Sequence, residues 1–131
     1  MNTKFKLTLA ALAGVALGAT AIQGLNAQTK PLGYIIAEVE VTDPAVYQTY
    51  LDRNTPLVAS AGGRILSRGE KIVALDGTPP KRFAIFVFDS VEKAQAYRDL
   101  PAYKEIMPIR DKGSKFRSFI VEGSVSGTLA K

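Results

Sequence analysis

Cysteine, histidine and tryptophan are all missing from this chain of 131 residues. Without cysteine there are no disulfides, no thiolate nucleophile and no Cys-ligated zinc or iron–sulfur cluster. Without histidine, the Ser-His-Asp and Cys-His catalytic systems, the usual proximal haem ligand and most protein zinc sites are excluded. We therefore predict no cofactor and no metal, and the residue types present indicate no particular enzymatic reaction.

A concentrated basic patch is also missing, although the chain carries 17 Lys and Arg against 12 Asp and Glu, for a net charge of +5. The charges are interspersed, and the one dense stretch, residues 110–117, includes an acid and is predicted as a solvated loop. Proteins that follow a phosphate backbone need a basic stripe or patch. The sequence therefore predicts no nucleic-acid partner. Apolar residues make up 47% of the chain and charged residues 22%, as in an ordinary globular domain.

The first 27 residues have the layout of a secretory signal peptide. Lys4 and Lys6 precede the uncharged stretch 7–22, and Leu25-Asn26-Ala27 offers a small-residue cleavage site, with Ala19-Thr20-Ala21 as a second choice. The stretch would make a helix of roughly 24 Å, shorter than the ~30 Å core of a bilayer. We expect Sec-type export to the periplasm or beyond with no stable membrane anchor after cleavage; the alternative is a retained N-terminal anchor.

After a short lead-in at residues 28–33, the chain predicts a strand followed by a helix. Residues 34–41 alternate between apolar and acidic side chains in their second half, which is typical of a strand with one buried face. Asp43 can cap a helix that begins at Pro44 and ends at Gly62-Gly63. Pro56 lies inside this helix and predicts a kink or a restart at Asn54-Thr55.

Further elements follow from the same signals. Residues 82–88 are apolar at nearly every position, which indicates a strand buried on both faces. The other predicted elements, in chain order, are a strand at 64–68, an extended continuation at 72–75, a helix capped by Ser90, a helical turn from Pro101 that Pro108 ends, a strand at 116–122, and a mobile tail over residues 124–131.

The order β-α-β-β-α-β predicts an α+β, ferredoxin-like domain over residues 34–123. Right-handed crossovers place the first and third strands at the centre of a four-stranded antiparallel sheet, with both helices on one face. The third strand then has Ala84, Phe86 and Phe88 on one face and Phe83, Ile85 and Val87 on the other. Left uncovered, the face away from the helices would be an unusually large exposed apolar patch. We therefore expect a second copy of the chain to cover it, as in a dimeric α/β barrel.

Several short motifs of residues 34–123 match a known family. They are Thr42-Asp43-Pro44, Tyr47, Tyr50, Pro56, Gly62-Gly63-Arg64, Arg68-Gly69, Phe86-x-Phe88-Asp89-Ser90 and Leu100-Pro101-Ala102-Tyr103. With these motifs, the region from Tyr34 to about Gly123 resembles the DUF1330 family, domains of unknown function within the dimeric α/β barrel superfamily. The resemblance implies a homodimer whose two sheets enclose a pocket, and it implies no reaction. The chain departs from the family in its export signal and in Pro108.

Side chains alternate between the two faces of a strand, and this alternation predicts a candidate ligand site on the face away from the helices. Tyr34, Glu38 and Glu40 share one parity on the first strand, and Arg64 and Arg68 share one parity on the second. One interpretation is a pocket that binds a small polar or anionic molecule, with arginines on a carboxylate and a glutamate available as a base. The other is that these residues form structural ion pairs at a dimer interface.

Three functional classes follow. The first is a ligand-binding or otherwise non-catalytic homodimer. The second is a cofactor-free enzyme of the barrel superfamily, of monooxygenase or isomerase type, acting on a small organic substrate. The third is an envelope stress or interaction protein. A fold by itself does not choose among them.

The export prediction can be tested by mass. Expressed with its natural start in a bacterium, the protein recovered from the periplasm or medium should have the intact mass of residues 28–131. Full-length protein in the membrane fraction would contradict cleavage after Ala27.

Overall fold

The computed structural model describes residues 30–126, which contain a four-stranded sheet in the order β2-β3-β1-β4. The central strands are β1 (Pro31–Val41) and β3 (Arg82–Phe88), which pair antiparallel with Ile35 opposite Phe86. The edge strands are β2 (Arg64–Gly69) and β4 (Ser114–Ser126). The predicted α+β, ferredoxin-like arrangement is confirmed, with the first and third strands at the centre.

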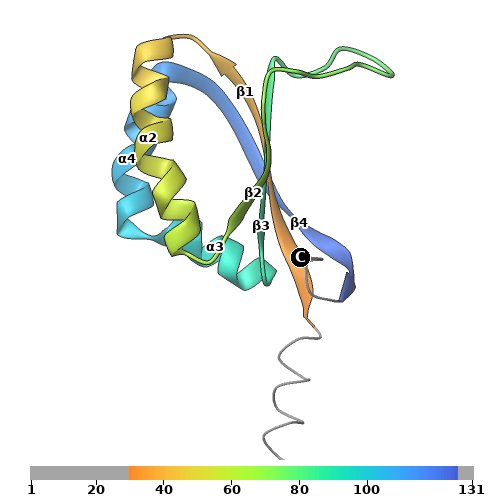
Figure 1. Ribbon diagram of the computed structural model, residues 1–131. Coiled ribbons are helices and arrows are strands. Elements are labelled where there is room, and N and C mark those ends of the chain that lie inside the picture. The colour runs from red at the N-terminus through yellow and green to blue at the C-terminus, as the bar shows by residue number, and fades with distance from the viewer. Residues whose placement is uncertain (1–29, 127–131) are drawn as a thin grey trace, which may run out of the picture. The chain divides into compact units, whose positions relative to one another are not determined.

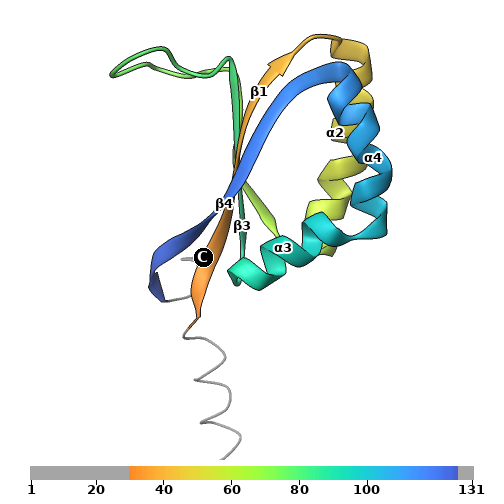
Figure 2. The same ribbon diagram turned by 180° about the vertical axis from the view of Figure 1, so that it is seen from behind.

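Three helices cover one face of the sheet: α2 (Pro44–Ser60), α3 (Val91–Asp99) and α4 (Pro101–Gly113) (Figures 1 and 2). Two of them begin at the predicted caps. The Asp43 carboxylate accepts from the Val46 amide at 3.2 Å, and the Ser90 hydroxyl accepts from the Lys93 amide at 3.1 Å. Each cap satisfies an amide that would otherwise lack a partner at the start of a helix.

The core lies between this sheet face and the helices. Alternate residues of β1 supply Ile35, Ala37 and Val39, which are at most 3% exposed. Burying a large apolar side chain stabilises a fold by about 1.5–3 kcal/mol, so this layer is the main source of stability. Aromatic residues fill much of the rest of the core: Tyr47, Tyr50, Phe86, Phe88, Tyr97 and Tyr103.

Neither internal proline ends its helix: α2 does not restart at Asn54-Thr55, and the prediction that Pro108 ends its helix was wrong. Helix α2 runs through Pro56 to Ser60, and α4 runs through Pro108 to Gly113. Both prolines are exposed. A proline removes one backbone hydrogen bond. At an exposed position the carbonyl that loses its partner can bond to water, while the buried face of the helix keeps its packing.

The prediction of a solvated loop at residues 110–117 was also wrong. Residues 110–113 form the last turn of α4, where Arg110 is only 7% exposed, and β4 begins at Ser114. Strand β4 continues to Ser126, so residues 124–126 belong to the sheet rather than to a tail; residues 127–131 lie outside the described residues. Strand β1 likewise starts at Pro31, within the predicted lead-in.

The connection between β2 and β3, residues 70–81, leaves the body of the domain. We call this segment the arm. It was predicted in part as a continuing strand, but residues 71–74 adopt no regular structure and the arm projects beyond the sheet (Figure 1). Val73 is 87% exposed and Leu75 is 91% exposed. Without a neighbouring strand to pair with, the apolar run at 72–75 does not form part of the sheet.

Gly113 joins the end of α4 to the start of α2. Its carbonyl accepts from the amides of Thr42 at 2.9 Å and Asp43 at 3.1 Å. A Cβ at this position would lie 2.7 Å from the backbone nitrogen of Tyr47. Since that neighbour is helix backbone, it has little freedom to move away.

We therefore expect Gly113→Ala to lower the free energy of unfolding by about 1–3 kcal/mol, the range for overpacked sites. Urea denaturation measures the loss. The control is Lys112→Ala, an exposed residue in the same turn, which should change stability by less than about 0.5 kcal/mol. Equal stability of the two variants would contradict the close approach.

Candidate functional site

A bulge in β2 places Arg64 and Arg68 on opposite faces of the sheet. Arg64 lies opposite Val87, whereas Arg68 lies opposite Ala84, and the register shifts by one residue between Ile65 and Ser67. One extra residue in a strand reverses the facing of every side chain beyond it. The expectation that both arginines share the face away from the helices was therefore wrong for Arg68.

The face away from the helices, here called the outer face, carries the other four predicted site residues, but it spreads them out. Tyr34 and Arg64 both lie beside Val87, on opposite sides of β3. Glu38 lies four residues further along β1, about 13 Å away at the usual rise of a strand. Glu40 is further still, so the structure does not gather these four residues into one pocket.

The two glutamates pair with cations that the sequence did not nominate. The Arg117 Nε donates to the Glu38 carboxylate at 2.6 Å, and the Lys81 Nζ lies 2.9 Å from the carboxylate of Glu40. The Lys81 hydrogen bond and charge, with a smaller contribution from Lys115, lower the pKa of Glu40. Glu38 therefore pairs with an arginine of β4, the strand next to β1, and not with Arg64 or Arg68 of β2. Glu40 pairs with a lysine from the segment just before β3.

Arg68 instead lies in a cleft of about 800 Å³ where the arm joins β2 and β3. Its charged side chains are three cations, Arg68, Lys71 and Arg82, and one carboxylate, Glu70. The residues that line the cleft are Ser67, Arg68, Gly69, Glu70, Lys71, Ile72, Pro80, Arg82 and Phe83.

The structure holds both arginines of this cleft in place. The Arg68 Nη1 donates to the Thr55 hydroxyl of α2 at 2.8 Å. The Arg82 guanidinium lies 5.5 Å from the centroid of the Tyr47 ring and 3.7 Å from the Glu70 carboxylate. Burial raises the pKa of Tyr47, and the nearby Arg82 and Arg68 charges oppose that rise without cancelling it. Tyr47 therefore stays a neutral phenol beneath two cations.

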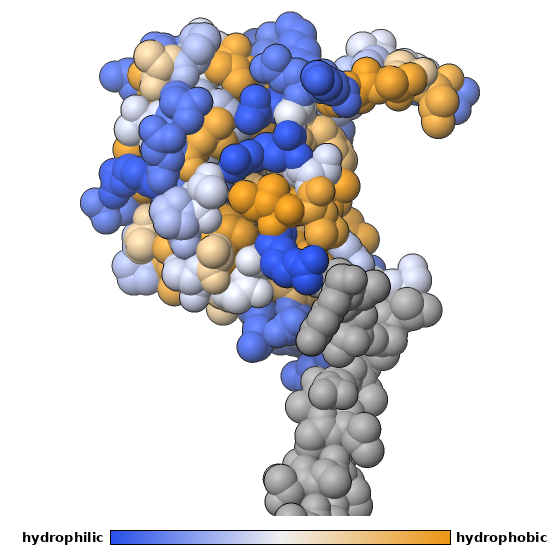
Figure 3. Space-filling model, in the orientation of Figure 1, coloured by the Kyte–Doolittle hydropathy of each residue, from blue (hydrophilic) through white to orange (hydrophobic). Residues whose placement is uncertain are grey.

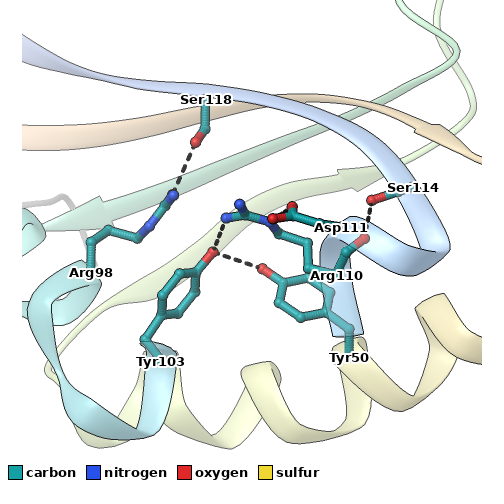
Figure 4. Close-up of polar contacts among 7 residues, drawn as sticks. All are labelled: Tyr50, Arg98, Tyr103, Arg110, Asp111, Ser114 and Ser118. Atoms are coloured by element: carbon teal, nitrogen blue, oxygen red, sulfur yellow. Dashed lines mark hydrogen bonds and ion pairs between the residues drawn. The ribbon is translucent and has the colours of Figure 1, made fainter. Parts of the chain in front are cut away.

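A second polar cluster, buried between the helices and the sheet, was missed by sequence reasoning (Figure 4). The Arg110 Nη1 donates to the Tyr103 hydroxyl at 2.8 Å, and that hydroxyl lies 3.2 Å from the hydroxyl of Tyr50. Nearby, the Arg98 Nη1 donates to Ser118 at 3.0 Å. Because Pro108 was predicted to end its helix, Arg110 was assigned to a solvated loop and was not recognised as a buried residue.

The described residues leave no buried side-chain polar atom without a hydrogen-bond partner. The Tyr97 hydroxyl, for example, donates to the side-chain oxygen of Asn54. Burial, followed by the neighbouring Tyr103, raises the pKa of both Tyr50 and Tyr97. A fully bonded cluster of this kind aligns α2, α3 and α4 on one another and specifies a single packing arrangement.

Within residues 30–126, no group of three or more metal-ligating side chains is gathered, and no helix is long and apolar enough to cross a membrane.

Comparison with protein families identifies the domain. The sequence profile described as Domain of unknown function (DUF1330) matches residues 32–124, most of the described chain. The chain belongs to the DUF1330 family. Among curated proteins, no sequence matches it.

Solved structures share the fold of this DUF1330 protein at low sequence identity. A protein of unknown function from Rhodopseudomonas palustris aligns with a TM-score of 0.57 and 16% identity over 79% of this chain and 91% of that one. SnoaB, a cofactor-independent oxygenase from Streptomyces nogalater, aligns with a TM-score of 0.53 and 12% identity over 77% and 99%. A dimeric protein of unknown function with a ferredoxin-like fold from Bacteroides fragilis aligns with a TM-score of 0.50 and 13% identity over 72% and 98%.

The raised tyrosine pKa values predict a loss of stability at alkaline pH. In an unfolded chain tyrosine titrates near pH 10, whereas Tyr47, Tyr50 and Tyr97 keep their protons to higher pH in the folded state. The stability that these three raised pKa values contribute is fully present below about pH 10. Above it the unfolded state binds fewer protons, so the free energy of unfolding falls, by up to about 1.4 kcal/mol per tyrosine at pH 11.

Urea denaturation at about pH 9 and pH 11 measures this loss. Tyr50→Phe is the control, because it removes one of the three groups and should make the loss smaller. An identical loss in the two proteins would contradict the role of Tyr50.

Proposed function

We propose that this DUF1330 protein is a two-fold homodimer that binds a small organic anion in the cleft beside β2. The observation that carries the ligand class is the charge of the cleft, where three cations face one carboxylate. A negatively charged ligand would balance that excess.

The geometry favours a carboxylate as the charged group. A guanidinium presents a planar fork of donors that matches the two oxygens of a carboxylate. The hydrogen bond to Thr55 leaves further Arg68 donors available, and it fixes the side chain before any ligand arrives. Ile72, Pro80 and Phe83 add apolar walls, which suit the carbon skeleton of an organic acid rather than a bare inorganic ion.

The homodimer part of the proposal rests on the outer face. Phe119 and Val121 are each 44% exposed on β4, the strand next to β1. On the central strands, half-buried Ile36 and Ile85 lie opposite each other on the same face. Packing a second sheet on this face would remove these side chains from water. The Bacteroides fragilis protein that shares the fold is described as dimeric, which supports the same assembly here.

The place of action is proposed from sequence alone. Residues 1–27 lie outside the described residues, and their basic start, uncharged stretch and small-residue site support export to the periplasm or the medium. The organic anion would then be one that is met outside the cytoplasm.

A cofactor-independent enzyme acting on a small organic substrate is the second candidate. It is supported by the fold shared with SnoaB and by the buried Tyr50–Tyr103–Arg110 cluster, in which phenols lie beside a guanidinium. A binding protein releases its ligand unchanged, whereas an enzyme converts it. Mass spectrometry of candidate organic acids incubated with the protein in air therefore separates the two candidates.

The anion site makes a prediction that distinguishes the two faces of β2. With benzoate as the probe and benzamide as its uncharged match, we expect Arg68→Ala to weaken benzoate binding about tenfold or more, the loss of one charge-assisted hydrogen bond. Arg64→Ala, the same change on the opposite face of the same strand, should alter the affinity less than twofold. Titration followed by NMR chemical shifts measures both.

Equal binding of benzoate and benzamide would contradict an anion site. A larger effect of Arg64→Ala than of Arg68→Ala would instead favour a site on the outer face.

A further inference from the structure

The arm, residues 70–81, carries the two most exposed large apolar side chains of the described residues. Val73 is 87% exposed and Leu75 is 91% exposed, against 44–45% for the other exposed large apolar residues. Side chains this exposed contribute almost no burial energy to their own subunit. A second surface that covers these side chains would explain why both positions are apolar.

The arm extends toward the side of the sheet that faces away from the helices. In Figures 1 and 2, which view the molecule from opposite sides, the helices and the arm lie on opposite sides of the sheet. Figure 3 shows apolar residues along much of the arm. The arm therefore projects from the outer face, on the side where Phe119 and Val121 are exposed. A protein molecule that packs on the outer face would therefore lie next to the arm.

Several contacts define the direction of the arm at its base. On one side, Glu70 contacts Arg82, and its carbonyl accepts from the Ile72 amide at 3.0 Å. On the other, Lys81 reaches Glu40 of β1 at 2.9 Å. The arm turns back at Gly77, whose φ of 72° lies in the left-handed region that favours glycine. The arm is thus anchored to the sheet at both ends.

A hollow of about 430 Å³ lies between the arm and the end of the outer face. Its lining comes from both sides: Thr78, Pro79, Pro80 and Lys81 of the arm, and Glu38, Val39, Glu40, Lys115, Phe116 and Arg117 of the sheet. The hollow thus joins the base of the arm to one end of β1 and β4. An occupant seated there would touch both the arm and the sheet.

We propose that the arm clasps a second copy of this chain, with Val73 and Leu75 packed against the partner subunit. This inference rests on the homodimer proposed above and assigns it a further contact. In a two-fold dimer each subunit both provides an arm and receives one, so one interface covers both outer faces and both arms. The arm has two lysines and two acids, so its zero net charge does not suit nucleic acid or an anionic membrane.

The first experiment measures dimer dissociation. Leu75→Asp places a charge in the clasp without changing the interior of the subunit, because Leu75 is 91% exposed there. We expect sedimentation equilibrium to give a dimer dissociation constant at least tenfold higher than for the unmodified mature protein. Ala45→Asp is the matched control, an exposed position at the start of α2 on the helix side, and it should leave the constant unchanged.

The second experiment asks what the arm touches. Since the chain has no cysteine, Leu75→Cys gives a single attachment point for a maleimide–benzophenone label. Irradiation of mixed ¹⁴N and ¹⁵N protein should link the arm to a peptide of the other isotope. Lys104→Cys, exposed on α4, should give no such product.

The outcomes separate this inference from the proposed function. If the unmodified protein is a monomer, the homodimer fails and the clasp with it. If it is a dimer but Leu75→Asp dissociates no more readily and the label links only within its own chain, the clasp alone is overturned. Arm cross-links to a different protein or to lipid, in a dimer whose affinity Leu75→Asp leaves unchanged, would likewise overturn a second copy as its occupant.

Discussion

Strand β3 has apolar side chains on both faces, and helices cover only one of them. Phe86 and Phe88 pack into the core, while Phe83 and Ile85 lie on the outer face among other half-exposed apolar residues. Burial of apolar area is the largest favourable term in folding and in most association. The same strand that builds the core of the subunit therefore also creates a face suited to a second sheet. The proposed dimer and the clasp both derive from this excess of apolar surface.

The distribution of charge depends on one local irregularity, the bulge between Ile65 and Ser67. Without it, Arg68 would lie on the outer face with Arg64. With it, Arg68 reaches Thr55 and joins Arg82 at the edge cleft. The outer face is left with ion pairs in which Arg117 and Lys81 balance Glu38 and Glu40. The single extra residue of the bulge thus places the excess positive charge in the edge cleft. The outer face, which two subunits can share, is left with balanced charges.

The buried polar cluster has a different part in the fold. Tyr50, Tyr103 and Arg110 come from α2 and α4, and each donor or acceptor depends on the others. Removing one partner would leave buried polar groups unsatisfied, which costs more than the bond itself contributes. The cluster therefore fixes how the helices sit on the sheet. By holding α2, it also fixes the position of Thr55 and Tyr47 beneath the arginines of the cleft.

Alternation, caps and turn residues were enough to predict the four strands of the sheet, though not all of their bounds, and the start of α2 at Pro44. The right-handedness of crossovers then gave the order of the strands. These signals are local: the period of a strand and the cap of a helix act over a few residues. The sequence also determined which faces of β1 and β3 are apolar. It did not determine whether Pro56 and Pro108 would break their helices, because exposure of the proline decides that. The bulge in β2, the pairing of Glu38 with Arg117 and the burial of Arg110 were decided by tertiary structure alone, since each depends on which distant segment lies alongside.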